Sequence, residues 1–134
     1  MTRQLSNYLF FTTTCEAALA FYTECGLGQV TELRRHGEAG APQPNEAMHG
    51  KILHAKFEGP GVLFYASDND DAEPMRGSAH ILMLDDQKET QQLFERLARG
   101  GTVTTAPGLQ PWGAYYGKLT DRFGVQWMLN CQLR

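Results

Sequence analysis

Two histidines, His54 and His80, are the residues of this sequence best suited to chemistry. Histidine changes charge near neutral pH and is a common metal ligand, so either ring could orient or protonate a ligand or bind a divalent metal. Gln126 and Asp68 could add oxygen donors, although no spacing ties them to the histidines. The other interpretation is that both histidines are hydrogen-bonded sheet residues, and we favour it for each ring taken alone.

The three cysteines, Cys15, Cys25 and Cys131, contain no CxxC pair and are odd in number. A disulfide framework or a zinc knuckle is therefore not expected, and we interpret them as reduced, partly buried thiols of a cytoplasmic protein. Cys15 lies near the start of a predicted helix, where the helix N-terminus lowers a thiol pKa. The sequence places no paired base beside it, so we do not expect a nucleophile.

An internal repeat sets the elements that must position these side chains. Residues 7–31 align without a gap on residues 80–104 and are identical at six of 25 positions. Each copy has the pattern of a short apolar strand, a capping box, an amphipathic helix and a glycine near the helix end. The capping boxes are Thr13-x-x-Glu16 and Asp86-x-x-Glu89. Unrelated strand–helix–strand units can also be aligned, but the shared register favours a duplicated module.

Periodicity predicts the same β-α-β-β-β order in both copies. In the first copy we expect strands at 7–11, 29–36, 51–57 and 62–67, with a helix at about 16–24. In the second we expect strands at 79–84, 102–105, 112–120 and 125–131, with a helix at 87–98. A surface loop at 37–50, interpreted as a lid or an excursion, and a solvated acidic linker at 69–77 complete the chain. Residues 1–134 are thus expected to form one domain of two modules, about 5–68 and 78–132.

Each predicted module has one sheet face covered by its helix, so the open faces of the two modules are expected to meet. We therefore predict an α+β fold in which two tandem modules form a curved mixed sheet around a cleft. The repeat matches Asn7 with His80 and Tyr65 with Met128. These four side chains are expected to converge in the cleft, together with His54.

Strand alternation adds further predictions. Tyr115 and Tyr116 must face opposite ways, so at least one of them lines the cleft or a dimer interface, and we take Tyr116 and Trp112 as cleft candidates. Within 51–57, the residues Leu53, Ala55 and Phe57 would share one face. Asp121 is expected to stabilise the predicted hairpin turn by bonding its own backbone.

Composition excludes several classes of partner. The 134 residues carry a formal net charge of −3, which gives no basic stripe for nucleic acid and no cationic face for a membrane surface. No stretch approaches the roughly 20 apolar residues that cross a bilayer. The first residues do not have the pattern of a signal peptide, so we expect a cytoplasmic location.

Three stretches, YLFF…CEAALAFY, ILHAKF and WGAYYGKLTDRFGVQWMLN, resemble the PhnB-like branch of the vicinal oxygen chelate superfamily. That superfamily includes glyoxalase I, extradiol dioxygenases, and fosfomycin- and bleomycin-resistance proteins. The resemblance implies the glyoxalase/bleomycin-resistance fold and a homodimer. It also implies metal-ligand positions on the first and last strand of each module, which fall on Asn7, Tyr65, His80 and Met128. Of these only His80 is a good ligand, so we expect the usual metal site to be degenerate.

We therefore expect a protein that binds an unidentified small organic molecule in an aromatic cleft, with no assigned catalytic residue. Its cleft-lining candidates are Asn7, His54, Tyr65, His80, Trp112, Tyr116, Gln126 and Met128. One alternative is a lyase, isomerase or transferase that uses Zn, Mn, Ni or Fe, with His80 and His54 as the first ligands. Another is a non-catalytic dimerisation module. The sequence has no Gly-rich nucleotide-binding loop, and we infer no methyltransferase activity.

Overall fold

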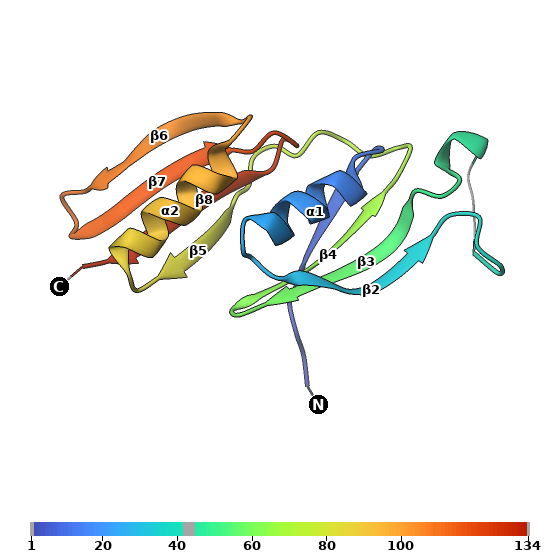
Figure 1. Ribbon diagram of the computed structural model, residues 1–134, viewed down its shortest axis with the longest axis horizontal. Coiled ribbons are helices and arrows are strands. Elements are labelled where there is room, and N and C mark those ends of the chain that lie inside the picture. The colour runs from blue at the N-terminus through green and yellow to red at the C-terminus, as the bar shows by residue number, and fades with distance from the viewer. Residues whose placement is uncertain (1, 42–44, 134) are drawn as a thin grey trace. The chain divides into compact units, whose positions relative to one another are not determined.

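The computed structural model describes residues 2–41 and 45–133 of the chain. The chain divides into two compact units, Met1–Glu73 and Pro74–Arg134. The boundary between them falls inside the stretch 69–77. Each unit contains its own four-stranded sheet and its own helix lying across that sheet (Figure 1).

The N-terminal unit has the order strand, helix, then three strands. Its elements are β1 (Asn7–Phe11), α1 (Cys15–Glu24), β2 (Gln29–Arg35), the short 3-10 helix η1 (Glu46–Met48), β3 (Ile52–Gly59) and β4 (Val62–Asp68). The strand order in the sheet is β1-β4-β3-β2. β1 runs parallel to β4, and the other neighbours are antiparallel.

The C-terminal unit repeats this plan with the same connectivity. Its elements are β5 (His80–Leu84), α2 (Gln87–Ala98), β6 (Thr102–Leu109), β7 (Ala114–Thr120) and β8 (Gln126–Gln132). The sheet order is β5-β8-β7-β6, again with a parallel pair between its first and last strand. The predicted α+β fold of two β-α-β-β-β modules is confirmed.

The largest difference from the predicted strand boundaries is at the end of β6. β6 continues through residues 106–109, beyond the predicted strand 102–105, although these residues include Pro107 and Gly108. Gly108 and Leu109 pair with Tyr116 and Tyr115 of β7, after a register shift that follows Thr105. β6 is an edge strand, where a proline and an irregular ladder are tolerated.

Each helix packs on one face of its own sheet. In α1, the residues Cys15, Ala18, Leu19 and Tyr22 recur at helical spacing and are buried. The Tyr22 ring meets Phe57 and Phe64 edge-on, at 6.4 and 6.0 Å between centroids. In the other unit, a Cβ on Gly117 of β7 would lie 2.7 Å from the ring of Phe94 in α2. We call these the helix faces of the two sheets, and we call the opposite faces the open faces.

The two helices begin differently, although their sequences predicted the same capping box. In α2 the side chain of Asp86 accepts a hydrogen bond of 2.7 Å from the Glu89 backbone N–H, as predicted. In α1 the N-cap residue is Thr14 instead of Thr13, and its side chain makes no such bond, so the Thr13-x-x-Glu16 prediction is wrong. The Cys15 N–H instead donates to Asp68 at the end of β4, at 2.9 Å.

The segment between β2 and β3 is only partly a surface loop. Residues 42–44 lie outside the described residues, so the lid interpretation is not tested there. Met48 is buried, with 2% of its surface exposed, which corrects the expectation of a wholly exposed loop. Arg35 donates to the Gly50 carbonyl at 2.9 Å and forms two hydrogen bonds with Glu16, which ties the end of this segment to α1.

Candidate functional site

The register of the N-terminal sheet decides which side chains share its open face. Tyr8 pairs with Tyr65 across β1 and β4, and Tyr65 pairs with Lys56 of β3. Paired residues point to the same side of a sheet, and neighbours along a strand point to opposite sides. Because Phe64 and Phe57 contact α1, the row Tyr8, Tyr65 and Lys56 lies on the open face.

Strand alternation places His54 on the same face, two residues before Lys56, and a β-bulge follows on its other side. Arg34 of β2 pairs with His54, but the next residue, Arg35, pairs with Ile52, so Leu53 is the extra residue. Ile52, Ala55 and Phe57 are buried on the helix face, whereas Leu53 and His54 are only half-buried. The predicted placement of Leu53 on one face with Ala55 and Phe57 is therefore wrong, because it assumed an unbroken alternation.

Three rings gather on this open face, from β1, β3 and β4. The centroids of Tyr8 and Tyr65 are 6.0 Å apart with nearly parallel planes, and those of His54 and Tyr65 are 5.6 Å apart. A hydrogen bond of 3.2 Å joins the Tyr8 hydroxyl oxygen to His54 Nδ1. We call these three residues the Tyr8–His54–Tyr65 cluster. Phe10 extends it along β1, at 5.0 Å from the Tyr8 ring.

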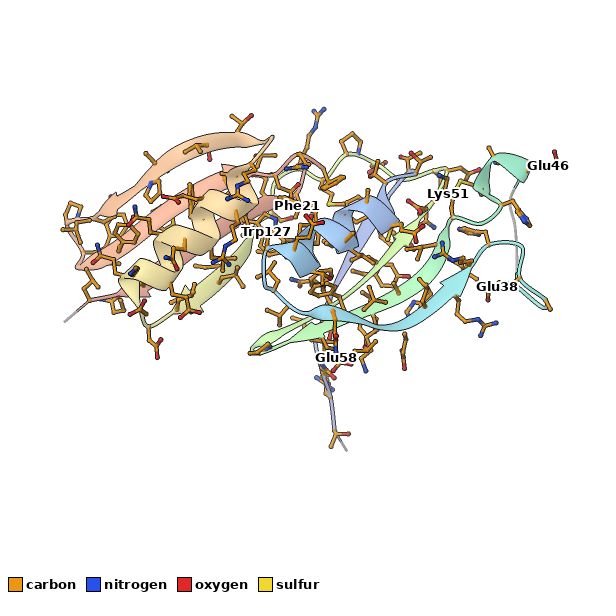
Figure 2. The ribbon with its side chains drawn as sticks, in the orientation of Figure 1. Phe21, Glu38, Glu46, Lys51, Glu58 and Trp127 are labelled. Carbon is orange, nitrogen blue, oxygen red and sulfur yellow. The ribbon has the colours of Figure 1, made fainter. Side chains whose placement is uncertain are left out.

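The charged side chains around the cluster are arranged in pairs. Lys56 lies 3.4 Å from Glu58, and this carboxylate raises the pKa of Lys56. The pKa of Glu58 is lowered, first by the Thr31 hydroxyl that donates to it at 2.8 Å and then by Lys56. Arg34 pairs with Glu38 at 3.3 Å. Glu58 of β3 lies beside the start of β2, and Glu38 lies just past its end (Figure 2).

Asn7 and His80 are placed differently from the prediction. Asn7 pairs with Phe64 and His80 with Trp127, so both follow the register of the helix faces. The His80 ring is half-buried, 5.3 Å from the Trp127 ring. Burial lowers the pKa of His80, and Asp121 partly opposes that shift. The expected convergence of Asn7 and His80 with Tyr65 and Met128 therefore fails within each sheet, because strand alternation separates them.

The open face of the C-terminal sheet has a different chemistry. Ile81 pairs with Met128, and Met128 pairs with Lys118, so Ile81 and Met128 take the positions that Tyr8 and Tyr65 hold in the other unit. Tyr116 shares this face, and the Trp112 ring lies 6.1 Å from it. Gln126 pairs with Thr120 on the same face. Among the predicted candidates of this unit, Tyr116, Gln126 and Met128 thus lie on the open face, whereas His80 follows the helix face.

The four positions that the resemblance matches to metal ligands are divided between the two kinds of sheet face. Asn7 and His80 follow the helix faces, whereas Tyr65 and Met128 follow the open faces. His54, the other histidine candidate, belongs to the N-terminal unit and His80 to the C-terminal unit. Within residues 2–41 and 45–133, no group of three or more His, Cys, Asp and Glu residues is arranged to hold a metal ion.

Two aspartates that might have served chemistry are structural. Asp68 is buried, and its carboxylate accepts from the backbone N–H groups of Cys15 at 2.9 Å and Ile52 at 3.1 Å, so it is neither solvated nor a ligand. Asp121 accepts from the N–H groups of Phe123 and Val125, which confirms its predicted role in the turn. It also accepts from the Trp127 indole at 2.9 Å.

Cys15 is a buried thiol in surroundings that disfavour its thiolate form. Burial raises the pKa of Cys15 far above its ordinary value, and the negative charges of Asp68 and Glu16 raise it further. The helix N-terminus beside it is already occupied by the Asp68 carboxylate. A neutral, buried thiol is a poor nucleophile, as the absence of a paired base in the sequence had suggested.

Sequence analysis missed Tyr8, which the structure places at the centre of the cluster. A signal was present, because Leu9 and Phe11 alternate with Tyr8 and Phe10 along β1. Tyr8 and Phe10 are 39% and 50% exposed, whereas Leu9 and Phe11 are buried. The prediction selected Asn7, the first residue of the strand, and so chose the side of β1 that carries Leu9 and Phe11 instead of the side that carries Tyr8 and Phe10.

Comparison with known proteins shows what the chain resembles. A family model described as 3-demethylubiquinone-9 3-methyltransferase matches residues 3–130. The crystal structure of protein PA1353 from Pseudomonas aeruginosa is 34% identical, with a TM-score of 0.88 over 99% of this chain and 100% of that one. A putative 3-demethylubiquinone-9 3-methyltransferase, PhnB protein, from Bacillus cereus is 24% identical, with a TM-score of 0.80 over 96% and 99%.

A more distant structure shares the fold. The glyoxylase/bleomycin resistance protein/dioxygenase domain from Frankia sp. EAN1pec is 13% identical, with a TM-score of 0.69 over 98% of this chain and 93% of that one. The resemblance to the glyoxalase/bleomycin-resistance fold and to its PhnB-like branch is confirmed. In the part of the chain that the structure describes, no helix is long and apolar enough to span a membrane.

Proposed function

Because the chain belongs to the 3-demethylubiquinone-9 3-methyltransferase family, whose PhnB-like members share its fold, we propose that it binds a small organic molecule at the Tyr8–His54–Tyr65 cluster. The observation that carries the proposal is the grouping of three rings and a polar pair on the open face of one sheet. Binding sites combine aromatic contact area with a few placed polar groups, and this cluster has both.

The exposure of the cluster supports binding over core packing. Tyr8 and Phe10 retain 39% and 50% of their surface, so their rings offer apolar area to a ligand. The cluster's aromatic rings have positive edges and negative faces, which favour stacked or edge-on contact with another planar ring. The helix-face rings of the same sheet, Phe57 and Phe64, are buried and have no such area to offer.

The proposal is limited to binding. The family description names a methyltransferase that acts on 3-demethylubiquinone. This sequence has no Gly-rich loop for a nucleotide-type methyl donor, so we do not extend the proposal to methyl transfer. Binding at the cluster also requires no metal, because the polar groups that it uses are the Tyr8 hydroxyl and the His54 ring.

A homodimer is the second part of the proposal. Phe10 lies on β1 and Ile81 and Met83 lie on β5, and these strands form one edge of each sheet. Exposed apolar side chains on edge strands favour pairing with another strand or chain. Light scattering after size-exclusion chromatography should give twice the 15.0 kDa chain mass, and a mass of one chain would exclude the dimer.

The binding proposal is tested with soluble aromatic fragments. Titration of the ¹⁵N-labelled protein with phenol, benzoate, benzylamine and nicotinamide should shift the amide signals of Tyr8, His54 and Tyr65 for at least one fragment. Tyr65→Leu should weaken the binding of that fragment, whereas Tyr115→Phe, which alters a tyrosine on the helix face, should not. The absence of any shift in β1, β3 and β4 would overturn the proposal, and metal analysis of the dialysed protein tests the metalloenzyme alternative separately.

A further inference from the structure

The hydrogen bond between Tyr8 and His54 restricts the polar group that the cluster can recognise. If the Tyr8 hydroxyl donates to His54 Nδ1, then Nε2 carries the imidazole proton and donates outward, and the Tyr8 oxygen keeps a lone pair. If Nδ1 carries the proton and donates to Tyr8, then the Tyr8 hydroxyl is the outward donor and Nε2 is the acceptor. In both arrangements the neutral pair presents one donor and one acceptor.

The group that matches such a pair must itself both donate and accept. A hydroxyl does so in either arrangement of the protons because its one oxygen can both donate and accept, and a lactam does so because it carries an N–H donor beside a C=O acceptor. A carboxylate has only acceptors and an ammonium only donors, so each leaves one member of the pair unmatched. A desolvated polar group without a partner weakens binding by more than one ordinary hydrogen bond.

The surrounding charges favour the same conclusion. The two basic residues that face the cluster, Arg34 and Lys56, each have a carboxylate partner, at 3.3 and 3.4 Å. An anionic ligand would have to compete with Glu38 and Glu58 for these cations. Nearby Glu58 also accepts from the Thr31 hydroxyl, which leaves less of its charge available to a cationic ligand.

The rings determine the shape of the ligand. Tyr65 is nearly parallel to Tyr8, at 21°, and to His54, at 28°, whereas Tyr8 and His54 are tilted by 46° to each other. Phe10 is tilted by 31° from Tyr8 and is half exposed at the margin. Two rings that lie nearly parallel to Tyr65, beside an exposed margin, suit a planar ring that stacks or meets them edge-on.

Building on the proposed function, we infer that the ligand of the Tyr8–His54–Tyr65 cluster is a neutral planar ring that carries a hydroxyl or lactam group, with this group hydrogen-bonded to the Tyr8–His54 pair. The C-terminal sheet holds Ile81 and Met128 at the positions of Tyr8 and Tyr65 and so lacks a matching polar pair there. The polar recognition is thus assigned to the N-terminal unit alone.

Four small aromatic probes test this inference: phenol, 2-pyridone, benzoate and benzylamine, titrated against the full chain by NMR. Phenol and 2-pyridone should bind with a Kd at least 3- to 10-fold lower than benzoate and benzylamine, as expected when one neutral hydrogen bond is gained or lost. Equal or tighter binding of benzoate or benzylamine overturns the inference but leaves the proposed function standing. If none of the probes shifts β1, β3 or β4, both are overturned.

Two variants locate the hydrogen bonds. Tyr8→Phe keeps the ring and removes the hydroxyl, so the Kd for phenol should rise about 3- to 10-fold while that for benzoate changes less. His54→Phe also keeps a ring and should do the same, whereas Tyr115→Phe is the matched control. Circular dichroism and amide spectra confirm that each variant is folded. Unchanged phenol binding in folded Tyr8→Phe and His54→Phe would also overturn the inference.

Discussion

Replacing Asp68 by asparagine should destabilise the protein far more than the same replacement at Asp86. Both carboxylates lie at the start of a helix, but Asp68 comes from β4 and accepts two backbone hydrogen bonds, from Cys15 and Ile52. An asparagine side chain has one acceptor oxygen, and its NH₂ group would face the other N–H as a second donor. One buried N–H would then lose its partner.

The magnitude follows from the burial of this site. Asp68 has 1% of its surface exposed, so water cannot replace the lost acceptor. A hydrogen bond to a charged group contributes about 1.5–3 kcal/mol, and a stranded buried donor costs about 1–3 kcal/mol. These two effects overlap, so we expect Asp68→Asn to lower the free energy of unfolding by about 2–4 kcal/mol.

Asp86→Asn is the matched control. The Asp86 side chain accepts one hydrogen bond, from the Glu89 backbone N–H at the exposed start of α2. Asparagine is as good an N-cap residue as aspartate. Its effect should stay within about 0.5 kcal/mol. Urea unfolding followed by circular dichroism measures both variants, with the slope of the transition compared as well as its midpoint. Equal losses in the two variants, or a loss below about 1 kcal/mol for Asp68→Asn, would refute this account of how α1 begins.

Three other predictions concern ionisation and packing. Burial raises the pKa of Cys15 from an ordinary value of 9.0, so the folded protein keeps this thiol protonated above pH 9 while the unfolded chain loses the proton. The free energy of unfolding should therefore be unaffected by Cys15 below pH 9 and fall by up to about 1.4 kcal/mol per pH unit above it. Cys15→Ala should flatten this slope in urea unfolding at pH 8–10. Burial lowers the pKa of His80 from 6.5, so burial of the neutral ring stabilises the fold above pH 6.5 and this contribution is lost as the pH falls below 6.5. His80→Phe should therefore reduce the difference in stability between pH 7.5 and pH 5.5. An unchanged difference would contradict the burial of His80 against Trp127. Gly101→Ala should destabilise by about 1–3 kcal/mol, since its Cβ would lie 2.3 Å from the Thr120 carbonyl oxygen, whereas Gly108→Ala, with open space around it, should change thermal stability little.

The elements and their order could be predicted because they depend on local patterns. The alternation of apolar residues marks the strands, and the stripe of Cys15, Ala18, Leu19 and Tyr22 marks α1, whose buried residues include all four. Asp86 and Glu89 predicted the start of α2 for the same reason, since the capping bond spans three residues. These features need no knowledge of the rest of the chain.

The candidate site was harder to predict because it depends on register between distant strands. The pairing of β1 with β4 and of β4 with β3 places His54 beside Tyr8, which is 46 residues away, and no local pattern reveals that pairing. The phase of β1, which favours Tyr8 over Asn7, could have been deduced from the buried pair Leu9 and Phe11. The role of Asp68 could not, because its partners are backbone groups, which carry no sequence signal.

The two ways of capping a helix also bear on the order in which the chain can fold during synthesis. The cap of α2 is complete as soon as residue 89 has left the ribosome, because Asp86 and Glu89 are sequence neighbours. The cap of α1 joins residues that are 53 positions apart, so the first turn of α1 must wait until β4 has been made and has found its place beside β1. Long-range contacts close slowly because ordering the intervening chain costs entropy. Two copies of one module thus differ in contact order: the helix made first completes its cap through a distant strand, and the helix made second completes its own.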